Sequence, residues 1–345
     1  MTLLDRLQGT VLAPLPHCAQ IQLTGADTLA VMHRLSTQHC SQLQPGHSCI
    51  NTLLTPKGRT VALLHQLVLP NNGLLLLGQP NQQQQIFDWI DKHIFIENIQ
   101  LLIADQQHTL WWLIGHQAAS TLQPLLNHPI PTTAWHCLPH HNDLLIRTFN
   151  CIDAQGQPTP AWLLRACNAP HSQLLQALQE HQHIYRCNSA ETEAIRIAAG
   201  IPRHSNEIND QTNPLQLGLH AAIHTNKGCY IGQEVISRLL TYNKVKGQLV
   251  KISCNQQTHQ QLQAGQQLYL SKQQLAIGHI TSVSPLFTPQ VAVALGLVKL
   301  PADITLPTDG LLGSHEAGAQ CLSMSEVSSP TTNLHLGNGK QEAAK

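Results

Sequence analysis

The sequence predicts an α+β protein that continues into a small all-β domain. Two observations predict this fold class. Between residues 17 and 115, strand-like and helix-like spacings of apolar residues follow one another, with hairpin turns that a regular doubly wound sheet would not contain. From residue 246 the pattern changes to short strands separated by turns, which favours a small β-barrel or sandwich.

The first region is expected to open with a strand over residues 19–23 and a helix over residues 28–35, which Thr24 or Asp27 can cap. Alternating segments at 49–54 and 60–69 flank the turn Thr55-Pro56-Lys57-Gly58, which is typical of a β-hairpin. Further strands are expected over 74–77, 110–114, 247–254, 266–270, 278–284 and 291–298. Further helices are expected over 83–93, 118–126, 172–181, 192–199 and 231–240.

These elements divide the chain into three parts. Residues 1–245 form the α+β region, which we expect to contain two subdomains, and residues 246–302 form the C-terminal β-barrel domain. Residues 303–345 are rich in Thr, Pro, Gly and Ser without a period, which predicts a disordered tail.

Composition excludes several classes of protein. Only 11% of the 345 residues are charged, against about 25% in an ordinary domain. Lys and Arg together number 19, as do Asp and Glu, which excludes a globally basic nucleic-acid binder, and we expect no direct binding of nucleic acid. No apolar run approaches the roughly 18 residues of a membrane span.

The N-terminus and the cysteines both predict a cytoplasmic protein. Asp5 and Arg6 interrupt the segment in which a signal peptide would need its apolar stretch. The ten cysteines are scattered and form no CxxC pair. In a chain of this length without an export signal, such cysteines are expected to be reduced and mostly buried.

The neutral total conceals one cationic segment. Residues 225–302 carry seven basic residues and one acidic residue, Glu234, for a net charge of +6. This asymmetry indicates an anionic partner. The alternative is a basic face that is merely solvated.

The most informative string runs from Thr225 to Arg238 and places Cys229 just before a predicted helix. A helix N-terminus favours a thiolate, and Lys227 adds a positive charge nearby. Gly228 and Gly232 allow a ligand or another backbone to approach closely. Spacing alone leaves two interpretations open, a reactive thiol or a buried structural one.

The string Lys227-Gly228-Cys229-Tyr230-Ile231-Gly232-Gln233-Glu234-Val235-Ile236-Ser237-Arg238 resembles the signature of the YgfZ family, folate-binding relatives of the glycine-cleavage T-protein, an aminomethyltransferase. Other stretches agree and fall in the same order. They are Leu23-Thr24-Gly25-Ala26-Asp27, Leu35-Ser36-Thr37, Leu43-Gln44-Pro45-Gly46, Leu53-Leu54-Thr55-Pro56-Lys57-Gly58-Arg59, Ile195-Arg196-Ile197-Ala198-Ala199-Gly200-Ile201-Pro202 and Gly278-His279-Ile280-Thr281-Ser282. The resemblance covers about residues 10–300.

The resemblance implies a T-protein-like arrangement of three domains around a central channel that holds tetrahydrofolate. It also implies support of iron–sulfur cluster assembly or repair, through iron–sulfur client enzymes that include those of tRNA modification. Cys229 is the characteristic residue of the family, and we expect it to be the catalytic thiol. The expected folate-binding residues are Lys227, Gly228, Tyr230, Gly232, Gln233, Glu234, Arg238, Arg196 and Gln216.

This sequence departs from the T-protein pattern at its acids. Val61, Ala62 and Leu63 follow Gly58 where T-proteins have an Asp pair, so no carboxylate is available there for proton handling. Acids of the family are also replaced at Ala198 and Gln216, and we therefore expect micromolar rather than nanomolar affinity for folate. Two alternatives remain: a folate-dependent aminomethyltransferase, and a non-enzymatic docking module for an anionic partner.

If the domains ring a channel, three lysines at the start of the barrel domain border its mouth. They are Lys244, Lys246 and Lys251. Folate carries an anionic glutamate tail that is often several residues long. We expect these lysines to bind that tail, with exposed contacts of about 0–1 kcal/mol each.

Two histidine-rich stretches are weaker signals. His136-Cys137 with His140-His141, and His181 and His183 with Cys187, have ligand-type side chains but no paired CxxC frame. In a chain with 22 histidines close pairs are common, so no metal site is expected.

Overall fold

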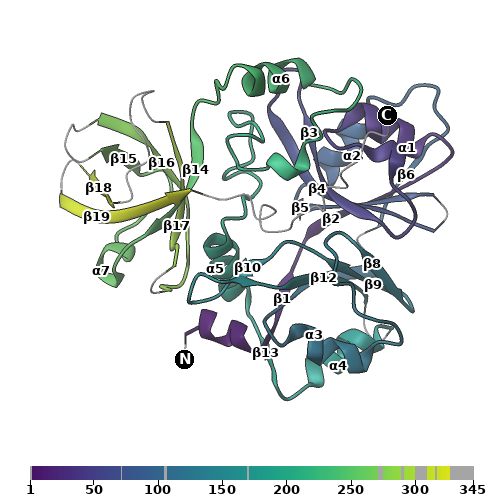
Figure 1. Ribbon diagram of the computed structural model, residues 1–345, viewed down its shortest axis with the longest axis horizontal. Helices are drawn as coiled ribbons and strands as arrows, with labels where there is room; N and C mark the ends of the chain where they lie inside the picture. Colours follow the sequence, from purple (N-terminus) through teal and green to yellow (C-terminus); the bar gives the residue numbers. More distant parts are fainter. Residues whose placement is uncertain are drawn as a thin grey trace, which may run out of the picture.

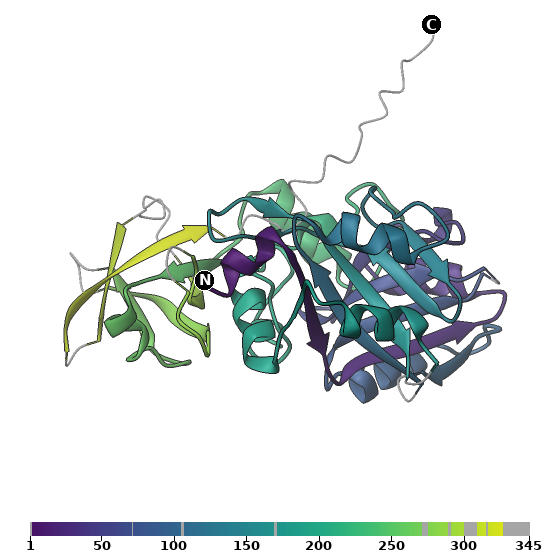
Figure 2. The same ribbon diagram turned by 90° about the horizontal axis from the view of Figure 1, so that it is seen from below.

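The computed structural model describes residues 2–70, 72–104, 107–168, 171–270, 275–288, 291–299, 309–314 and 317–326. Its framework is three sheets of five, six and six strands (Figure 1). The first two sheets lie against each other, and the third sits beside them, as Figure 2 shows from below. None of the helices in the described ranges is long and apolar enough to cross a membrane.

The five-stranded sheet is antiparallel, with the order β3-β4-β5-β2-β6. Its strands are β2 (Cys18–Thr24), β3 (Ser48–Leu54), β4 (Thr60–Val68), β5 (Leu74–Pro80) and β6 (Gln100–Ile103). Helices α1 (Thr28–Leu35) and α2 (Gln83–Asp91) cover one face, where Met32 and Ile86 pack with Ile21 and Leu64. The predicted helix over residues 28–35 is confirmed.

The predicted hairpin is also confirmed. Strands β3 and β4 pair in antiparallel register from Ser48 opposite Leu67 to Leu54 opposite Thr60. In the connecting turn the Gly58 amide donates to the Thr55 carbonyl at 2.8 Å, and Gly58 has a φ of +70°. That conformation suits glycine, which has no Cβ.

The second sheet has the order β13-β1-β7-β12-β9-β8. Its strands are β1 (Thr10–Leu15), β7 (His108–Ile114), β8 (Cys137–His140), β9 (Asp143–Arg147), β12 (Ala161–Cys167) and β13 (Ile184–Arg186). Helices α3 (Ala118–Leu122) and α4 (Gln173–Glu180) cover its outer face. Its inner face shares one core with the five-stranded sheet, in which Trp112 and Leu163 pack with Leu67 and Leu77.

Several smaller elements complete the first region. They are the short ribbon β10 (Cys151–Ile152) with β11 (Pro158–Thr159), the helices α5 (Ser189–Ala199) and α6 (Gln233–Thr241), and the 3-10 turns η1 (Leu4–Gln8), η2 (Cys40–Gln42), η4 (Gln123–Leu125) and η5 (His220–Ala222). Helix α5 begins in a capping box formed by Asn188 and Glu191 and ends at Gly200, whose φ is +74°. It lies between the first two sheets and the third (Figure 1).

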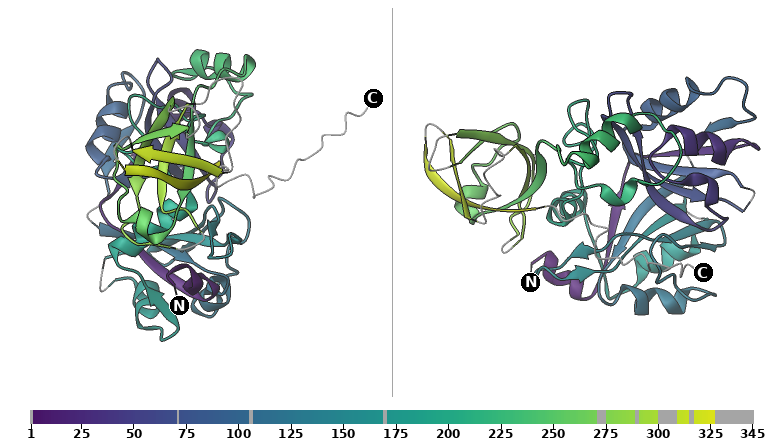
Figure 3. Two further views of the ribbon diagram at one scale, coloured as in Figure 1. Left: turned by 90° about the vertical axis from the view of Figure 1, so that its left-hand side faces the viewer. Right: turned by 45° about the horizontal axis from the view of Figure 1, so that its top comes forward.

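The third sheet has the order β15-β16-β17-β14-β19-β18, and its outer strands β15 and β18 lie close together, so the sheet curls strongly (Figure 3). Its elements are β14 (Gln248–Ser253), α7 (Gln256–His259), β15 (Gln267–Leu270), β16 (Leu275–Val283), β17 (Ala294–Val298), β18 (Asp309–Ser314) and β19 (Ala317–Glu326).

The prediction of a disordered tail from residue 303 is wrong for strands β18 and β19. Strand β19 pairs with β14 from Val250 opposite Glu326 to Ser253 opposite Ser323. Because β17 covers only one edge of β14, the other edge would expose unpaired backbone groups without β19. The composition of this segment, rich in Gly and Ser, gave no local sign that β19 pairs with β14. The rest of the predicted tail lies outside the described residues.

Candidate functional site

A cavity of about 250 Å³ lies where the first two sheets face each other. Strand β4 contributes Leu63 and His65, and strand β7 of the other sheet contributes Leu110 and Trp112. Helix α5 and the segment after it close one side. The cavity is therefore built by three parts of the fold that are distant in sequence.

The floor of the cavity is apolar and aromatic. Trp112 and Phe149 meet edge to face, with ring centroids 5.8 Å apart at 85°. The ring of His65 lies 6.2 Å from Phe149, between centroids. Burial lowers the pKa of His65 to about 4, so the ring is neutral at physiological pH. A flat, largely apolar ligand fits such a floor.

One wall of the cavity is charged. The Arg196 guanidinium binds the Glu193 carboxylate through Nη2 at 2.7 Å and Nε at 2.9 Å, and Arg203 lies 3.3 Å from the same carboxylate. Arg196 is only 6% exposed, and its Nη1 also donates to the carbonyl of Ile201. The side chain of Arg203 is 40% exposed, which places it where the wall reaches solvent.

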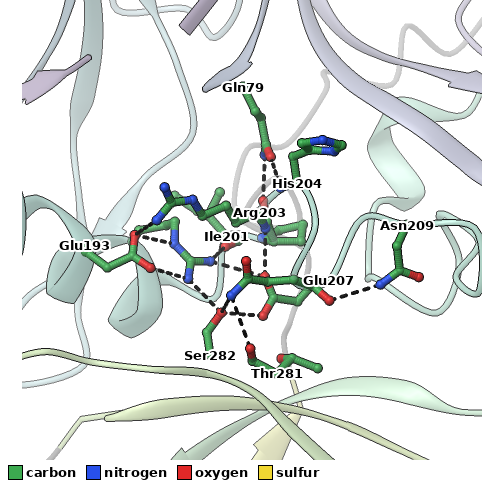
Figure 4. A network of polar contacts seen from close by, with 12 residues as sticks. Gln79, Glu193, Ile201, Arg203, His204, Glu207, Asn209, Thr281 and Ser282 are labelled. Atoms are coloured by element: carbon green, nitrogen blue, oxygen red, sulfur yellow. Dashed lines mark hydrogen bonds and ion pairs between the residues drawn. The ribbon is translucent and has the colours of Figure 1, made fainter. Parts of the chain in front are cut away.

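A buried carboxylate connects this wall to the third sheet (Figure 4). Glu207 accepts from the Ser282 hydroxyl at 2.6 Å, from the Arg203 amide at 2.8 Å and from Arg196 Nη1 at 3.4 Å. Its side chain is fully buried, at 0% exposure. Since Ser282 belongs to β16, the third sheet helps to hold Arg196 in place.

Of the ten predicted site residues, only Arg196 lines the cavity. The string around Cys229 lies elsewhere, against α1 and the β3–β4 turn. Cys229 is exposed, whereas the other eight cysteines whose side chains are described are buried or half-buried, and all nine are free thiols. Helix α6 begins at Gln233, two residues later than expected, so Cys229 does not adjoin its first turn.

Lys227 does not serve mainly as a charge beside the thiol. Its Nζ donates to the carbonyls of His33 at 2.5 Å, Ser36 at 2.7 Å and Gln38 at 2.8 Å, and so caps the C-terminal end of α1. Burial lowers the pKa of Lys227 to about 8. Its ammonium also lies 5.0 Å from the centre of the Tyr230 ring, which is itself buried. These contacts tie the loop that carries Cys229 to α1.

The two glycines of the string differ in their surroundings. Gly232 has a φ of +83°, and a Cβ there would lie 2.7 Å from the Thr55 carbonyl oxygen. Gly232 therefore allows the close contact with the β3–β4 turn. A Cβ on Gly228 would meet His33 Nε2 at 3.8 Å, an ordinary contact.

The remaining predicted residues make local contacts. Glu234 pairs with Arg238 at 2.8 Å on the exposed face of α6, so Arg238 does not turn back toward Cys229. The Gln233 amide donates to the Tyr230 carbonyl at 3.2 Å, which closes the turn before α6. Gln216 accepts from Asn213 Nδ2 at 2.9 Å and donates to the Lys246 carbonyl at 2.5 Å. Both ends of its amide are thus occupied where the chain enters the third sheet.

Sequence reasoning missed most polar residues of the cavity and its wall, and four of these define the floor and the charged wall. They are His65, Glu193, Arg203 and Glu207. Glu193 could have been found, because it lies three residues before Arg196 on a predicted helix and therefore on the same face. His65 gives no such signal, since its setting depends on a second sheet. Across the described ranges, no group of three His, Cys, Asp or Glu side chains is placed to hold a metal ion.

Comparison with known proteins places this geometry in a known fold. The chain superimposes on the glycine cleavage system aminomethyltransferase T of Bartonella henselae with a TM-score of 0.79 and 18% identity, over 94% of this chain and 88% of the other. The chain has the T-protein fold. No protein-family model matches the sequence.

Curated relatives agree with the T-protein fold at the level of sequence. A chloroplastic protein of Arabidopsis thaliana that is named as a transferase is 26% identical over 246 residues, which are 70% of this chain and 55% of that protein. An aminomethyltransferase of Picosynechococcus is 22% identical over 223 residues, 64% of this chain and 61% of its own length. One from Halalkalibacterium halodurans is 23% identical over 289 residues, 81% of this chain and 76% of its own. This chain thus spans less than two thirds of the first two relatives.

Proposed function

We propose that this chain is a YgfZ-type folate-binding protein, with the cavity as the central channel that holds reduced folate. In this proposal the chain has three domains around that channel. The two facing sheets of residues 1–245 form the first two, and the curled C-terminal sheet forms the third, a β-barrel. The observation that carries the proposal is the cavity itself: an aromatic floor with a neutral His65, and a charged wall built on Arg196. The pterin ring would occupy the floor, and the anionic glutamate would leave past Arg203.

The residues of the cavity suit this ligand. A pterin is flat and carries hydrogen-bonding groups at its edge, and the floor offers apolar surface with one polar ring that has no protein partner on its buried nitrogen. Bound tetrahydrofolate would supply a carrier of one-carbon units. The chain's own residues would bind it, orient it and exclude water.

Aminomethyl transfer is the weaker candidate. The residues Val61, Ala62 and Leu63 at the start of β4 carry no acid, and the Glu193 carboxylate that reaches the cavity is already bound by two arginines. A general base must be free to take a proton in reach of the ligand. The cavity is thus better suited to holding folate than to moving protons on it.

The proposed function has two tasks: binding folate, and supporting iron–sulfur cluster assembly or repair in client enzymes, including those of tRNA modification. The exposed Cys229 is proposed to act in the second task. Its loop is held to α1 by Lys227, which presents the thiol at the surface. A surface thiol is accessible to a partner protein. The proposed partners are iron–sulfur client enzymes, the proposed compartment is the cytoplasm, and direct binding of nucleic acid is not part of the proposal.

Calorimetry with tetrahydrofolate tests the first task. We expect a micromolar dissociation constant, about −8 kcal/mol. A lack of binding at millimolar folate would favour the docking module, in which the basic segment binds an anionic partner. Transfer of a methylene group onto a lipoyl-amine carrier at rates typical of T-proteins would instead revive the transferase.

A separate experiment tests the second task. Cys229→Ser should keep the wild-type affinity for tetrahydrofolate, because Cys229 does not line the cavity. The same variant should abolish support of iron–sulfur enzymes in cells that lack the wild-type protein. Full support by Cys229→Ser would remove the thiol from the proposal without touching folate binding.

A further inference from the structure

The floor of the cavity contains a polar ring whose hydrogen bonds the protein leaves unused. His65 lies on β4 next to the apolar residues of the floor. Its Nδ1 is buried and has no hydrogen-bond partner. Its Nε2 makes no hydrogen bond to any residue in the part of the chain that the structure describes. A buried polar group of this kind is rare in a folded protein and calls for a ligand or a functional explanation.

The position of the ring proton follows from these surroundings. Because burial holds the pKa of His65 near 4, the ring is neutral and carries a single N–H. An N–H enclosed without an acceptor is the least tolerated arrangement of a buried polar group. Since Nδ1 is enclosed and Nε2 is not among the enclosed unpartnered atoms, the proton belongs on Nε2, and we infer that Nε2 is the nitrogen directed to the cavity that His65 lines. His65 is then a hydrogen-bond donor that faces the ligand.

The neighbours of His65 define what this donor can meet. Trp135 lies 5.6 Å from the His65 ring between centroids, and Phe149 lies 6.2 Å away, so the donor is set among aromatic surfaces. The charged groups of the cavity, Glu193, Arg196 and Arg203, belong to α5 and the segment after it, and both arginines pair with Glu193. A neutral acceptor on a flat ring therefore suits His65 better than a charged group.

We propose that His65 donates its Nε2–H to the carbonyl oxygen of the pterin ring and thereby selects oxo-pterins over amino-pterins. This inference rests on the proposed binding of reduced folate in the cavity. A 4-amino group in place of the carbonyl would put two donors face to face. Selection of this kind is strong in a closed site, because the mismatched group loses its partner in water and gains none in the protein.

The test compares tetrahydrofolate with its 4-amino counterpart by calorimetry, on the wild type and on His65→Phe. We expect the wild type to bind the oxo compound about 2- to 12-fold more tightly than the amino compound, the range of one net hydrogen bond. His65→Phe should lose about the same factor toward the oxo compound and should not discriminate between the two. Phenylalanine fits beside Phe149 and Trp135 without a polar atom.

His65→Gln separates the hydrogen bond from the shape of the ring. An amide can present either its N–H₂ or its oxygen to the ligand. This variant should therefore bind both compounds with affinities within about threefold of each other, and it reports even if His65→Phe does not fold. The matched control is His108→Phe. Burial also lowers the pKa of His108 to about 4 and leaves its Nδ1 unpartnered, but His108 does not line the cavity.

The outcomes distinguish the inference from the function on which it rests. If His65→Phe keeps the wild-type affinity and preference, His65 does not select the ligand, while folate binding stands. If His108→Phe loses the preference as His65→Phe does, the effect is a general consequence of removing a buried histidine and the inference is wrong. If the wild type binds neither compound, the proposed function itself is wrong.

Discussion

Replacing Ser282 with alanine tests whether the third sheet holds the cavity wall in place. The Ser282 hydroxyl donates to the buried Glu207 carboxylate at 2.6 Å and accepts from Arg196 Nη2 at 3.0 Å and from Asn206 Nδ2 at 3.1 Å. Ser282 itself is 3% exposed, so water cannot easily replace it. Hydrogen bonds to charged groups contribute about 1.5–3 kcal/mol each.

The expected cost of Ser282→Ala is about 2–3 kcal/mol in the free energy of unfolding. This cost is smaller than the contribution of two full charge-assisted hydrogen bonds, because Arg196 keeps its bidentate contact with Glu193 and Glu207 keeps the hydrogen bond from the Arg203 amide. Folate affinity should fall as well, since Arg196 loses one of the groups that orient it. Ser284→Ala is the matched control. Its hydroxyl is equally buried but bonds only to the neutral backbone of Leu286, donating to the carbonyl and accepting from the amide, and its loss should cost about 1 kcal/mol.

Urea unfolding followed by tryptophan fluorescence measures this effect. The five tryptophans lie between residues 89 and 162, so the signal comes from the first two sheets. A lower midpoint at constant slope would report lost stability rather than a change in the exposed surface. If Ser282→Ala lowers the stability no more than Ser284→Ala, the third sheet is not coupled to the wall through this network and the reasoning fails.

Four further predictions concern single features of the fold. Gly232→Ala should destabilise the protein by about 1–3 kcal/mol, because of its left-handed backbone and the Thr55 carbonyl, whereas Gly228→Ala should be tolerated; thermal unfolding of the pair decides. The free energy of unfolding should fall as the pH drops from about 6.5 to 4, because His65 takes up a proton in the unfolded chain but stays neutral in the folded protein. His65→Phe should remove about 3 kcal/mol of that loss in acid titrations. Brief limiting alkylation should label Cys229 first, since it is exposed while burial raises the pKa of Cys18, Cys137, Cys151 and Cys187 to about 12; peptide mapping that finds another thiol first would contradict this. Replacing Lys244, Lys246 and Lys251 by Gln should abolish tighter binding of longer folate polyglutamates without affecting the monoglutamate, and equal affinities for both tail lengths in the wild type at low salt would refute the idea.

The elements that the sequence predicted well carry a strong local signal. Helix α1 has one apolar and one polar side, and the β3–β4 hairpin is marked by its turn Thr55-Pro56-Lys57-Gly58, although β3 is buried throughout; the bounds of both agree with prediction to within one or two residues. Strands β1 and β12 were missed because they are buried on both faces, so their side chains do not alternate. The charged residue Arg165 makes β12 still harder to predict from the sequence. Its Nε donates to Gln20 Oε1 at 2.8 Å, a partner 145 residues away that no local pattern reveals.

In the candidate site too, a local motif was informative and contacts between distant segments were not. Arg196 was predicted from its motif, and it does line the cavity. The folate-binding role of the string around Cys229 is expected from the family resemblance, whereas its glycines alone left open the close approach of a ligand or of another backbone. In the structure Gly232 and Lys227 make contacts with the β3–β4 turn and with α1, and neither partner is close in sequence. Spacing along the chain could not separate a ligand contact from a contact between segments.

The pairing of charges in the cavity wall argues for binding rather than catalysis. Arg196 and Arg203 are matched by Glu193 and Glu207, and the buried pair Arg196 and Glu207 is held by several hydrogen bonds each. A charge that is fully engaged in a network is rigid, and it neither takes nor gives a proton without disrupting its partners. Such a wall can orient a ligand. Among the described residues of the aromatic floor, His65 is then a polar group whose hydrogen bond is free for the ligand, and a neutral donor on such a floor recognises a ring without changing its protonation.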